Sequence, residues 1–329
     1  MMDLYLLSKY RTQLMGIAAL FIIICHAPVY GVELTHYVRM LFVWGNIGVD
    51  IFLFLSGLGC FYSLSHYKQN KSNWILKRYK RIAIPYIIIQ VVFLAYFVCC
   101  SDFRLSSWLL EFSTISFWTN HTGCWYIAFL LPVYAIAPFM FVCLKIQERY
   151  RHIVFFVLLV LTIVLVNTGN VEMKDNTSIL YNIKWAFKRY PGFLLGMYLA
   201  PYILSKKKIH IVKLLGITAI GFLLFNTVFT TVYGWWFYVP LICLVFSYFL
   251  KCLWEATVIN SLLKWIGGAS LESYVTNIQT KAIMPSIMSS FSDNPILYGH
   301  YFDYSLVIIL GLFLTYYCHN LSKIIAQKI

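Results

Sequence analysis

The sequence predicts an all-α polytopic membrane protein with about ten transmembrane helices. Of its 329 residues, 61% are hydrophobic and only 12% are charged, and the mean hydropathy is +0.75. A soluble globular domain carries about 25% charged residues. A chain this apolar has more hydrophobic surface than one protein core can bury. The composition therefore excludes a soluble enzyme, a disordered protein and a nucleic-acid-binding domain.

Long apolar runs recur along the whole chain, and a helix that crosses the bilayer needs roughly 20 such residues. Polar breaks divide the runs into ten predicted spans, at 12–31, 39–64, 82–100, 124–144, 152–168, 186–204, 211–230, 234–250, 262–285 and 304–322. The break between the seventh and eighth spans is weak, and the ninth span is unusually polar. We expect residues 1–329 to form a single transmembrane domain with no appended soluble domain.

The positive charge of the chain is distributed unevenly between the predicted loops. The formal net charge is +14, and 19 of the 26 Lys and Arg residues lie in segments that are cytoplasmic if the N-terminus is cytoplasmic. Cytoplasmic loops of membrane proteins carry an excess of Lys and Arg, and such segments bind anionic lipid. The charge therefore predicts two cytoplasmic termini and contact with membrane lipid, not with nucleic acid.

Two ionisable residues stand within the first two predicted spans. His26 lies about 21 Å from the inner end of the first predicted helix, and Asp50 lies about 22 Å from the inner end of the second, at 1.5 Å per residue. An ionisable group inside the bilayer is costly and therefore a candidate for function. A carboxylate beside an imidazole orients it as a general base, so the two form a predicted catalytic pair. The alternative is a neutral His26 bonded to a backbone carbonyl, with Asp50 capping a helix break at 45–48.

A basic cluster follows the second span. Arg78 and Arg81 are three residues apart, which places both guanidinium groups on one helix face, where they could clamp a diphosphate. The alternative is that these residues only orient the helix as a topology signal.

Other polar residues near the spans define weaker candidate sites. Glu272 lies in the ninth span, where it either belongs to a functional polar network or neutralises a cation on another helix. Trp125 and Arg189 lie at the predicted outer face, where they either contact a sugar or anchor the protein at the membrane interface. No spacing of Cys and His residues indicates a metal site, so we expect no metal.

Several of these segments together resemble a known family. The order and setting of segments 14–20, 25–27, 48–57, 77–86, 124–127, 189–197 and 270–274 are similar to those of the acyltransferase-three family of integral-membrane acyltransferases. The most specific part is Gly-Val-Asp…Ser-Gly at 48–57 together with His26. The family includes bacterial O-acetyltransferases that modify cell-surface polysaccharides.

The resemblance implies transfer of an acyl group, usually acetyl from cytoplasmic acetyl-CoA, to a hydroxyl of a polysaccharide or glycolipid. It also implies a location in the bacterial cytoplasmic membrane. By this resemblance His26 is the catalytic residue, either as a base or as the acyl acceptor, and Arg78 and Arg81 hold the donor. Acetyl-CoA or another acyl-CoA is then the expected donor substrate.

The sequence departs from the family pattern at two positions. Met15 stands where the family usually has Arg, and Arg11, one turn earlier on a similar helix face, is a candidate to replace it. Asn277 stands near a position where many members have His. Two alternatives to the enzyme therefore remain: a transporter or flippase for a lipid-linked glycan, and a catalytically inactive subunit of an envelope-assembly complex.

Overall fold

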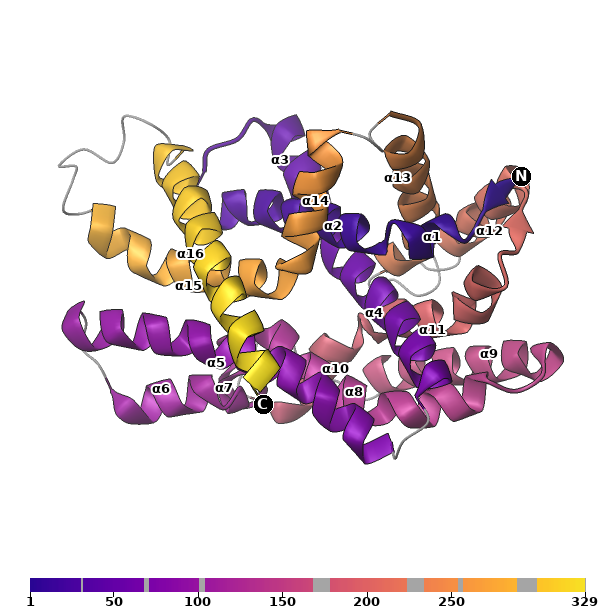
Figure 1. Ribbon diagram of the computed structural model, residues 1–329, viewed down its shortest axis with the longest axis horizontal. Helices are drawn as coiled ribbons and strands as arrows, with labels where there is room; N and C mark the ends of the chain where they lie inside the picture. Colours follow the sequence, from indigo (N-terminus) through magenta and orange to yellow (C-terminus); the bar gives the residue numbers. More distant parts are fainter. Residues whose placement is uncertain are drawn as a thin grey trace.

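The computed structural model describes residues 1–30, 32–67, 71–100, 104–167, 178–223, 234–253, 257–288 and 301–328. The chain is all-α, as predicted. Its α-helices are α1 (Leu6–Lys9), α2 (Arg11–His26), α3 (His36–Trp44), α4 (Ile47–His66), α5 (Lys71–Cys100), α6 (Leu105–Phe112), α7 (Ile115–Asn120), α8 (Trp125–Leu144), α9 (Glu148–Asn167), α10 (Ile179–Phe187), α11 (Tyr190–Leu204), α12 (Ile211–Leu223), α13 (Val239–Leu253), α14 (Val258–Gly268), α15 (Ser270–Met288) and α16 (Tyr301–Lys328). Two short 3-10 helices, η1 (Ala27–Tyr30) and η3 (Gly234–Phe237), complete the helical elements (Figure 1).

Five of the described stretches are long and apolar enough to cross a membrane. They are His36–His66, which joins α3 and α4, and then Lys71–Tyr96, Trp125–Leu144, Glu148–Asn167 and Tyr304–Lys328. Three shorter apolar helices are Arg11–His26, Ile211–Leu223 and Val239–Cys252. Each of these eight overlaps a predicted span, although the span predicted at 211–230 runs into residues 224–233, which lie outside the described residues. The count of ten spans and the cytoplasmic position of both termini stay predictions.

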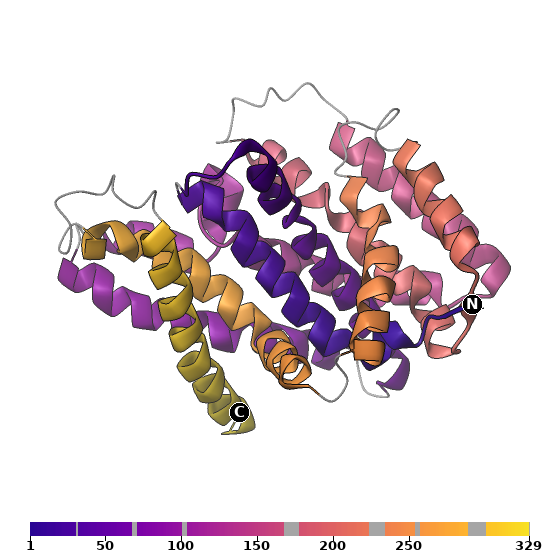
Figure 2. The same ribbon diagram turned by 90° about the horizontal axis from the view of Figure 1, so that it is seen from above.

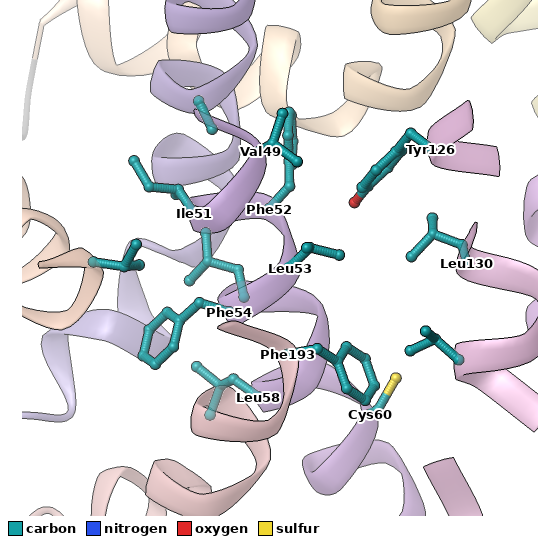
Figure 3. Packing of buried hydrophobic residues seen from close by; sticks show 14 of the residues in the cluster. Val49, Ile51, Phe52, Leu53, Phe54, Leu58, Cys60, Tyr126, Leu130 and Phe193 are labelled. Atoms are coloured by element: carbon teal, nitrogen blue, oxygen red, sulfur yellow. The ribbon is translucent and has the colours of Figure 1, made fainter. Parts of the chain in front are cut away.

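Helix α4 forms the centre of the core. It is hydrophobic on all sides, which is typical of a helix surrounded by other helices, and most of its residues are buried. Figure 3 shows its side chains meeting Tyr126 and Leu130 of α8 and Phe193 of α11. The helix therefore links the early and middle parts of the chain.

Two pairs of helices approach each other closely at glycines. In the α4–α11 pair, a Cβ at Gly57 would lie 2.0 Å from the Phe193 carbonyl oxygen, and one at Gly196 would lie 2.0 Å from the Phe54 carbonyl oxygen. In the α2–α14 pair, a Cβ at Gly16 would lie 2.2 Å from the Leu263 carbonyl oxygen. Only glycine allows backbones to pack at these distances, as in other helix pairs of membrane proteins.

The span predicted over 262–285 is two helices instead of one. Helix α14 ends at Gly268, Ala269 caps it, and α15 begins at Ser270 in a different direction (Figures 1 and 2). The chain turns at the Gly-Gly-Ala sequence at 267–269, where two glycines, which are poor helix formers, are followed by a small residue. The hydropathy pattern missed the break because apolar residues continue on both sides of it.

Contacts at the N-terminus join several of the predicted inner segments. The two-residue strands β1 (Met2–Asp3) and β2 (Lys208–Ile209) pair antiparallel, with Met2 opposite Ile209. Lys207 Nζ lies 3.1 Å from Glu148 Oε1. The N-terminus and the two loops after α8 and α11 therefore lie on the same side of the molecule, as the predicted topology requires.

Candidate active site

His26 is the last residue of α2, and its side chain is half-buried. Its Nδ1 lies 2.8 Å from Oδ1 of Asn277 on α15. A carbonyl oxygen only accepts hydrogen bonds, so this contact is a hydrogen bond in the tautomer that carries its proton on Nδ1, which leaves the lone pair of a neutral imidazole on Nε2. A nitrogen in this state can take a proton from a hydroxyl or attack an acyl carbon.

A small pocket lies beside this pair, between α2, α4 and α15. Its volume is about 10 Å³, roughly the space of one water molecule. The lining residues are Ala19, Ile22, Ile23, Phe52, Ser270, Ser273, Tyr274 and Asn277. Because Ile22 and Ile23 are three or four residues before His26, the pocket lies one helical turn from the imidazole.

Asp50 does not pair with His26, contrary to the prediction. The carboxylate is fully buried, and its Oδ2 lies 3.0 Å from Nη1 of Arg189. Asp50 Oδ1 has no hydrogen-bond partner in the part of the chain that the structure describes. Arg189 also donates from Nη2 to Oδ1 of Asn46, at 2.9 Å. Asp50 therefore belongs to an ion pair between α4 and the start of α11.

The register of α2 against α4 explains this correction. Gly48 faces Ala18, and Arg11 Nε donates to the Leu55 carbonyl oxygen at 3.0 Å. These contacts place Asp50 near the level of Ala18, eight residues before His26, or about 12 Å along the axis. The prediction assumed that the inner ends of the two helices are level, but α4 extends to His66, well past the start of α2. The predicted break at 45–48 is present, since α3 ends at Trp44 and α4 begins at Ile47.

Three arginines from α2 and α5 converge on the part of α4 around Gly59. Arg78 Nη2 donates to the Gly59 carbonyl oxygen at 3.1 Å, and Arg11 lies against the same glycine. Arg81 and Arg78 both act electrostatically on Arg11. No carboxylate of the described residues forms an ion pair with any of the three. The cluster therefore concentrates positive charge that could bind phosphate groups.

Gly59 allows this convergence. A Cβ at that position would lie 2.6 Å from Arg11 Nη2, so any side chain would displace the guanidinium group. Met15, at the family's usual Arg position, packs against the hydrophobic core instead. Arg11 thus joins Arg78 and Arg81, although the sequence alone left this open.

The cluster and His26 lie at opposite ends of α2. Arg11 is the first residue of this helix and His26 is the last, so about 22 Å separates their backbones along the axis. This distance suits one extended ligand whose phosphates bind at one end of α2 and whose reactive group reaches the other.

Glu272 forms a buried pair with His319 of α16. Their Oε1 and Nδ1 atoms lie 2.8 Å apart. One turn further along α15, the hydroxyl groups of Thr276 and Thr315 share a hydrogen bond at 2.8 Å. This network joins α15 to α16, and the partner of Glu272 is a histidine and not the Lys or Arg that the packing interpretation proposed.

Trp125 of α8 belongs to a cluster of aromatic rings with Trp185 of α10 and His121, the residue that follows α7. Its ring meets that of Trp185 edge to face at 4.9 Å, and Trp185 meets His121 in the same way at 4.7 Å. Arg189 Cζ lies 6.0 Å from the centre of the Trp125 ring. The three rings are half-buried, so each keeps a surface open to a ligand or to lipid. Next to this cluster, Tyr126 contacts Phe52 and Tyr274, which both line the pocket beside Asn277.

The sequence did not indicate which residues pair with the candidates. Asn277 binds His26 across 251 residues of sequence, Asn46 binds Arg189 across 143, and His319 binds Glu272 across 47. The one available signal was the unusual polarity of the ninth span, which contains Asn277. No group of three or more His, Cys, Asp or Glu side chains in the described part of the chain could hold a metal ion.

Together, the apolar helices and the buried polar residues define a polytopic membrane protein with a histidine site inside its helical bundle. The model of the acyltransferase-three family, described as an acyltransferase domain, matches residues 13–322. The chain therefore belongs to this family of membrane acyltransferases. No curated protein and no solved structure matches it significantly.

Proposed function

We propose that this protein is an O-acyltransferase of the bacterial cytoplasmic membrane that acylates a hydroxyl of a cell-surface or exported polysaccharide. The acyl group is acetyl, and the donor is acetyl-CoA. One observation carries the proposal: a cluster of three arginines and a histidine held by Asn277 lie at opposite ends of α2. Membership of the acyltransferase family supports it.

In this proposal Arg11, Arg78 and Arg81 bind the phosphates of the donor. Guanidinium groups suit this task because their planar donors match phosphate oxygens in pairs. The pantetheine arm of coenzyme A, which is of the order of the length of α2, then carries the thioester toward His26.

His26 acts on the acceptor. Nε2 takes the proton of the sugar hydroxyl while its oxygen forms a bond to the acyl carbon. The carbon–sulfur bond of the thioester breaks, and the sulfur leaves and receives the proton from His26. The products are an O-acyl ester and free coenzyme A, so that atoms and charge balance. Trp125, Trp185 and His121 offer rings for stacking against the acceptor sugar, with Arg189 beside them.

The test compares variants of the purified protein in lipid nanodiscs with labelled acetyl-CoA and the host's surface polysaccharide. His26→Ala should lower acyl transfer by about 10²-fold or more, because general base catalysis contributes about 10²–10⁴-fold. It should leave acetyl-CoA binding unchanged. Arg78→Ala, Arg81→Ala and Arg11→Ala should each weaken binding severalfold while the protein stays folded.

Two matched controls separate site effects from general ones. His66→Ala removes a histidine at the end of α4, and Arg149→Ala removes an exposed cation at the start of α9. Both should keep activity and binding. Full activity in His26→Ala would contradict the assignment. Loss of polysaccharide export with intact ester groups would favour the transporter, and absence of transfer by the unaltered protein would favour the inactive subunit.

A further inference from the structure

Asn277, which lines the pocket, holds the imidazole of His26 by a direct contact. The two residues are 251 positions apart in the chain, and their side chains meet at 2.8 Å. Asn277 is only 3% exposed. We infer that Asn277 is a positioning residue for His26: its Oδ1 accepts Nδ1–H, orients the ring and keeps the lone pair on Nε2. The hydrogen bond that one ring nitrogen makes decides which nitrogen carries the proton.

The helix that carries Asn277 is itself firmly held. Glu272 pairs with His319 at 2.8 Å, and the hydroxyl of Thr276, the residue before Asn277, bonds that of Thr315 on α16. A positioning residue acts only if its own backbone is fixed, since a loose partner would let the ring rotate. The contacts between α15 and α16 supply that support, and they place the amide against the end of α2.

An amide also differs from a carboxylate in charge. A carboxylate at this position would favour the imidazolium form, whereas a neutral amide orients the ring without adding a charge. Asp50 is already paired with Arg189, so it does not take this role. The structure therefore assigns to Asn277 the orientation of His26 that the sequence attributes to Asp50.

The tautomer can be observed directly, without any substrate. Selective labelling of histidine with ¹⁵N gives separate NMR signals for protonated and unprotonated ring nitrogens, and His26→Gln identifies the signals of His26. The unaltered protein in detergent micelles should show Nδ1 protonated and Nε2 unprotonated. Asn277→Asp keeps an oxygen in place and should keep Nδ1 protonated, whereas Asn277→Leu should populate both tautomers.

Thr280→Val is the matched control, because Thr280 is fully buried on the same helix and its hydroxyl donates within α15, to the Thr276 carbonyl oxygen. This variant should leave the signals of His26 unchanged. An unprotonated Nδ1 in the unaltered protein would overturn the inference. So would an Asn277→Leu protein with the same tautomer as the unaltered one; Asn277→Ala gives the same test if the Leu variant does not fold.

A kinetic measurement extends the inference, and this part alone rests on the proposed function. Asn277→Leu should lower kcat about tenfold, which corresponds to the loss of one hydrogen bond, and leave the KM for acetyl-CoA within about twofold. Asn277→Asp should recover part of kcat. An unchanged kcat in Asn277→Leu would overturn the role of Asn277 in the reaction. If the unaltered protein transfers no acyl group, the proposed function fails while the NMR result still decides the tautomer.

Discussion

Arg189 joins two distant parts of the chain through one guanidinium group. It is 4% exposed, and it binds the Asp50 carboxylate and the side chain of Asn46. Asn46 lies at the break between α3 and α4, so Arg189 fixes that break to the start of α11. A buried charge is costly unless it is paired, and the pairing here is between two residues that are both buried. At the scale of the residue, the structure thus gives Asp50 a place in the ion pair with Arg189 and not a contact with His26.

Removing one partner of this pair should therefore destabilise the protein. Asp50→Ala removes the carboxylate that balances the buried charge of Arg189, which should cost about 3–5 kcal/mol. The double variant Asp50→Leu with Arg189→Met removes both charges and should recover most of that loss. Thermal unfolding in detergent measures both effects. A stable Asp50→Ala protein that has lost acyl transfer would return Asp50 to the catalytic machinery.

Helices α4 and α11 meet at a reciprocal pair of glycines. Gly57 lies against the carbonyl of Phe193, and Gly196 lies against the carbonyl of Phe54. The contact is between backbones, so it cannot adjust by rotation of a side chain. Because α4 also carries Asp50 and Gly59, this packing sets the positions of both the ion pair and the arginine cluster.

Alanine at either glycine should force the two helices apart. Gly57→Ala and Gly196→Ala should each cost about 1–3 kcal/mol, which is typical of an overpacked core. Gly216→Ala on α12 is the control, because a Cβ there would meet nothing within 4 Å. Its melting temperature should stay the same or rise slightly, since alanine favours helix. Equal melting temperatures for all three variants would contradict the close packing of α4 and α11.

The sequence predicted elements better than it predicted how they face one another. Apolar runs located the helices because each run reports local hydropathy; His26 stood out because it interrupts such a run, and Arg78 and Arg81 because their spacing puts them on one helix face. The pairing of Asp50 with Arg189 depended on the relative heights of α2 and α4, which no local pattern records. On α15, Asn277, Gln279 and Glu272 find their partners on α2, α6 and α16, so these partners emerge only from the folded chain.

At the scale of the whole molecule, several segments that are predicted to be cytoplasmic lie together on one side. The strand pair β1–β2 and the Lys207–Glu148 ion pair join segments that the charge pattern assigns to the cytoplasm, and the bond from Asp3 N–H to the Tyr248 hydroxyl joins the N-terminal segment to the inner end of the predicted eighth span. Figure 1 shows the N-terminus beside α12, at the opposite end of the molecule from α15 and α16. Which membrane face this side occupies is a separate question, which labelling can answer.

A cysteine introduced at position 207 should add labelling only from the cytoplasm, and one introduced at position 122 only from outside. Lys207→Cys and Thr122→Cys are both at exposed residues, on loops that the ten-span topology puts on opposite faces. A membrane-impermeant maleimide applied to intact cells and to inverted vesicles distinguishes the two. The unaltered protein, with its native cysteines, measures the background. Labelling of both positions from the same face would contradict the predicted topology.

Helix α15 cannot satisfy Glu272 until the helix that follows it has been made. During synthesis α2 is present early, but His319 and Thr315 belong to α16, which leaves the ribosome after α15. Until then Glu272 lacks the imidazole of His319, and a lone carboxyl group in lipid is unfavourable. We therefore expect α15 to enter the membrane together with α16, so that this step of biogenesis also places Asn277 against His26 and completes the site.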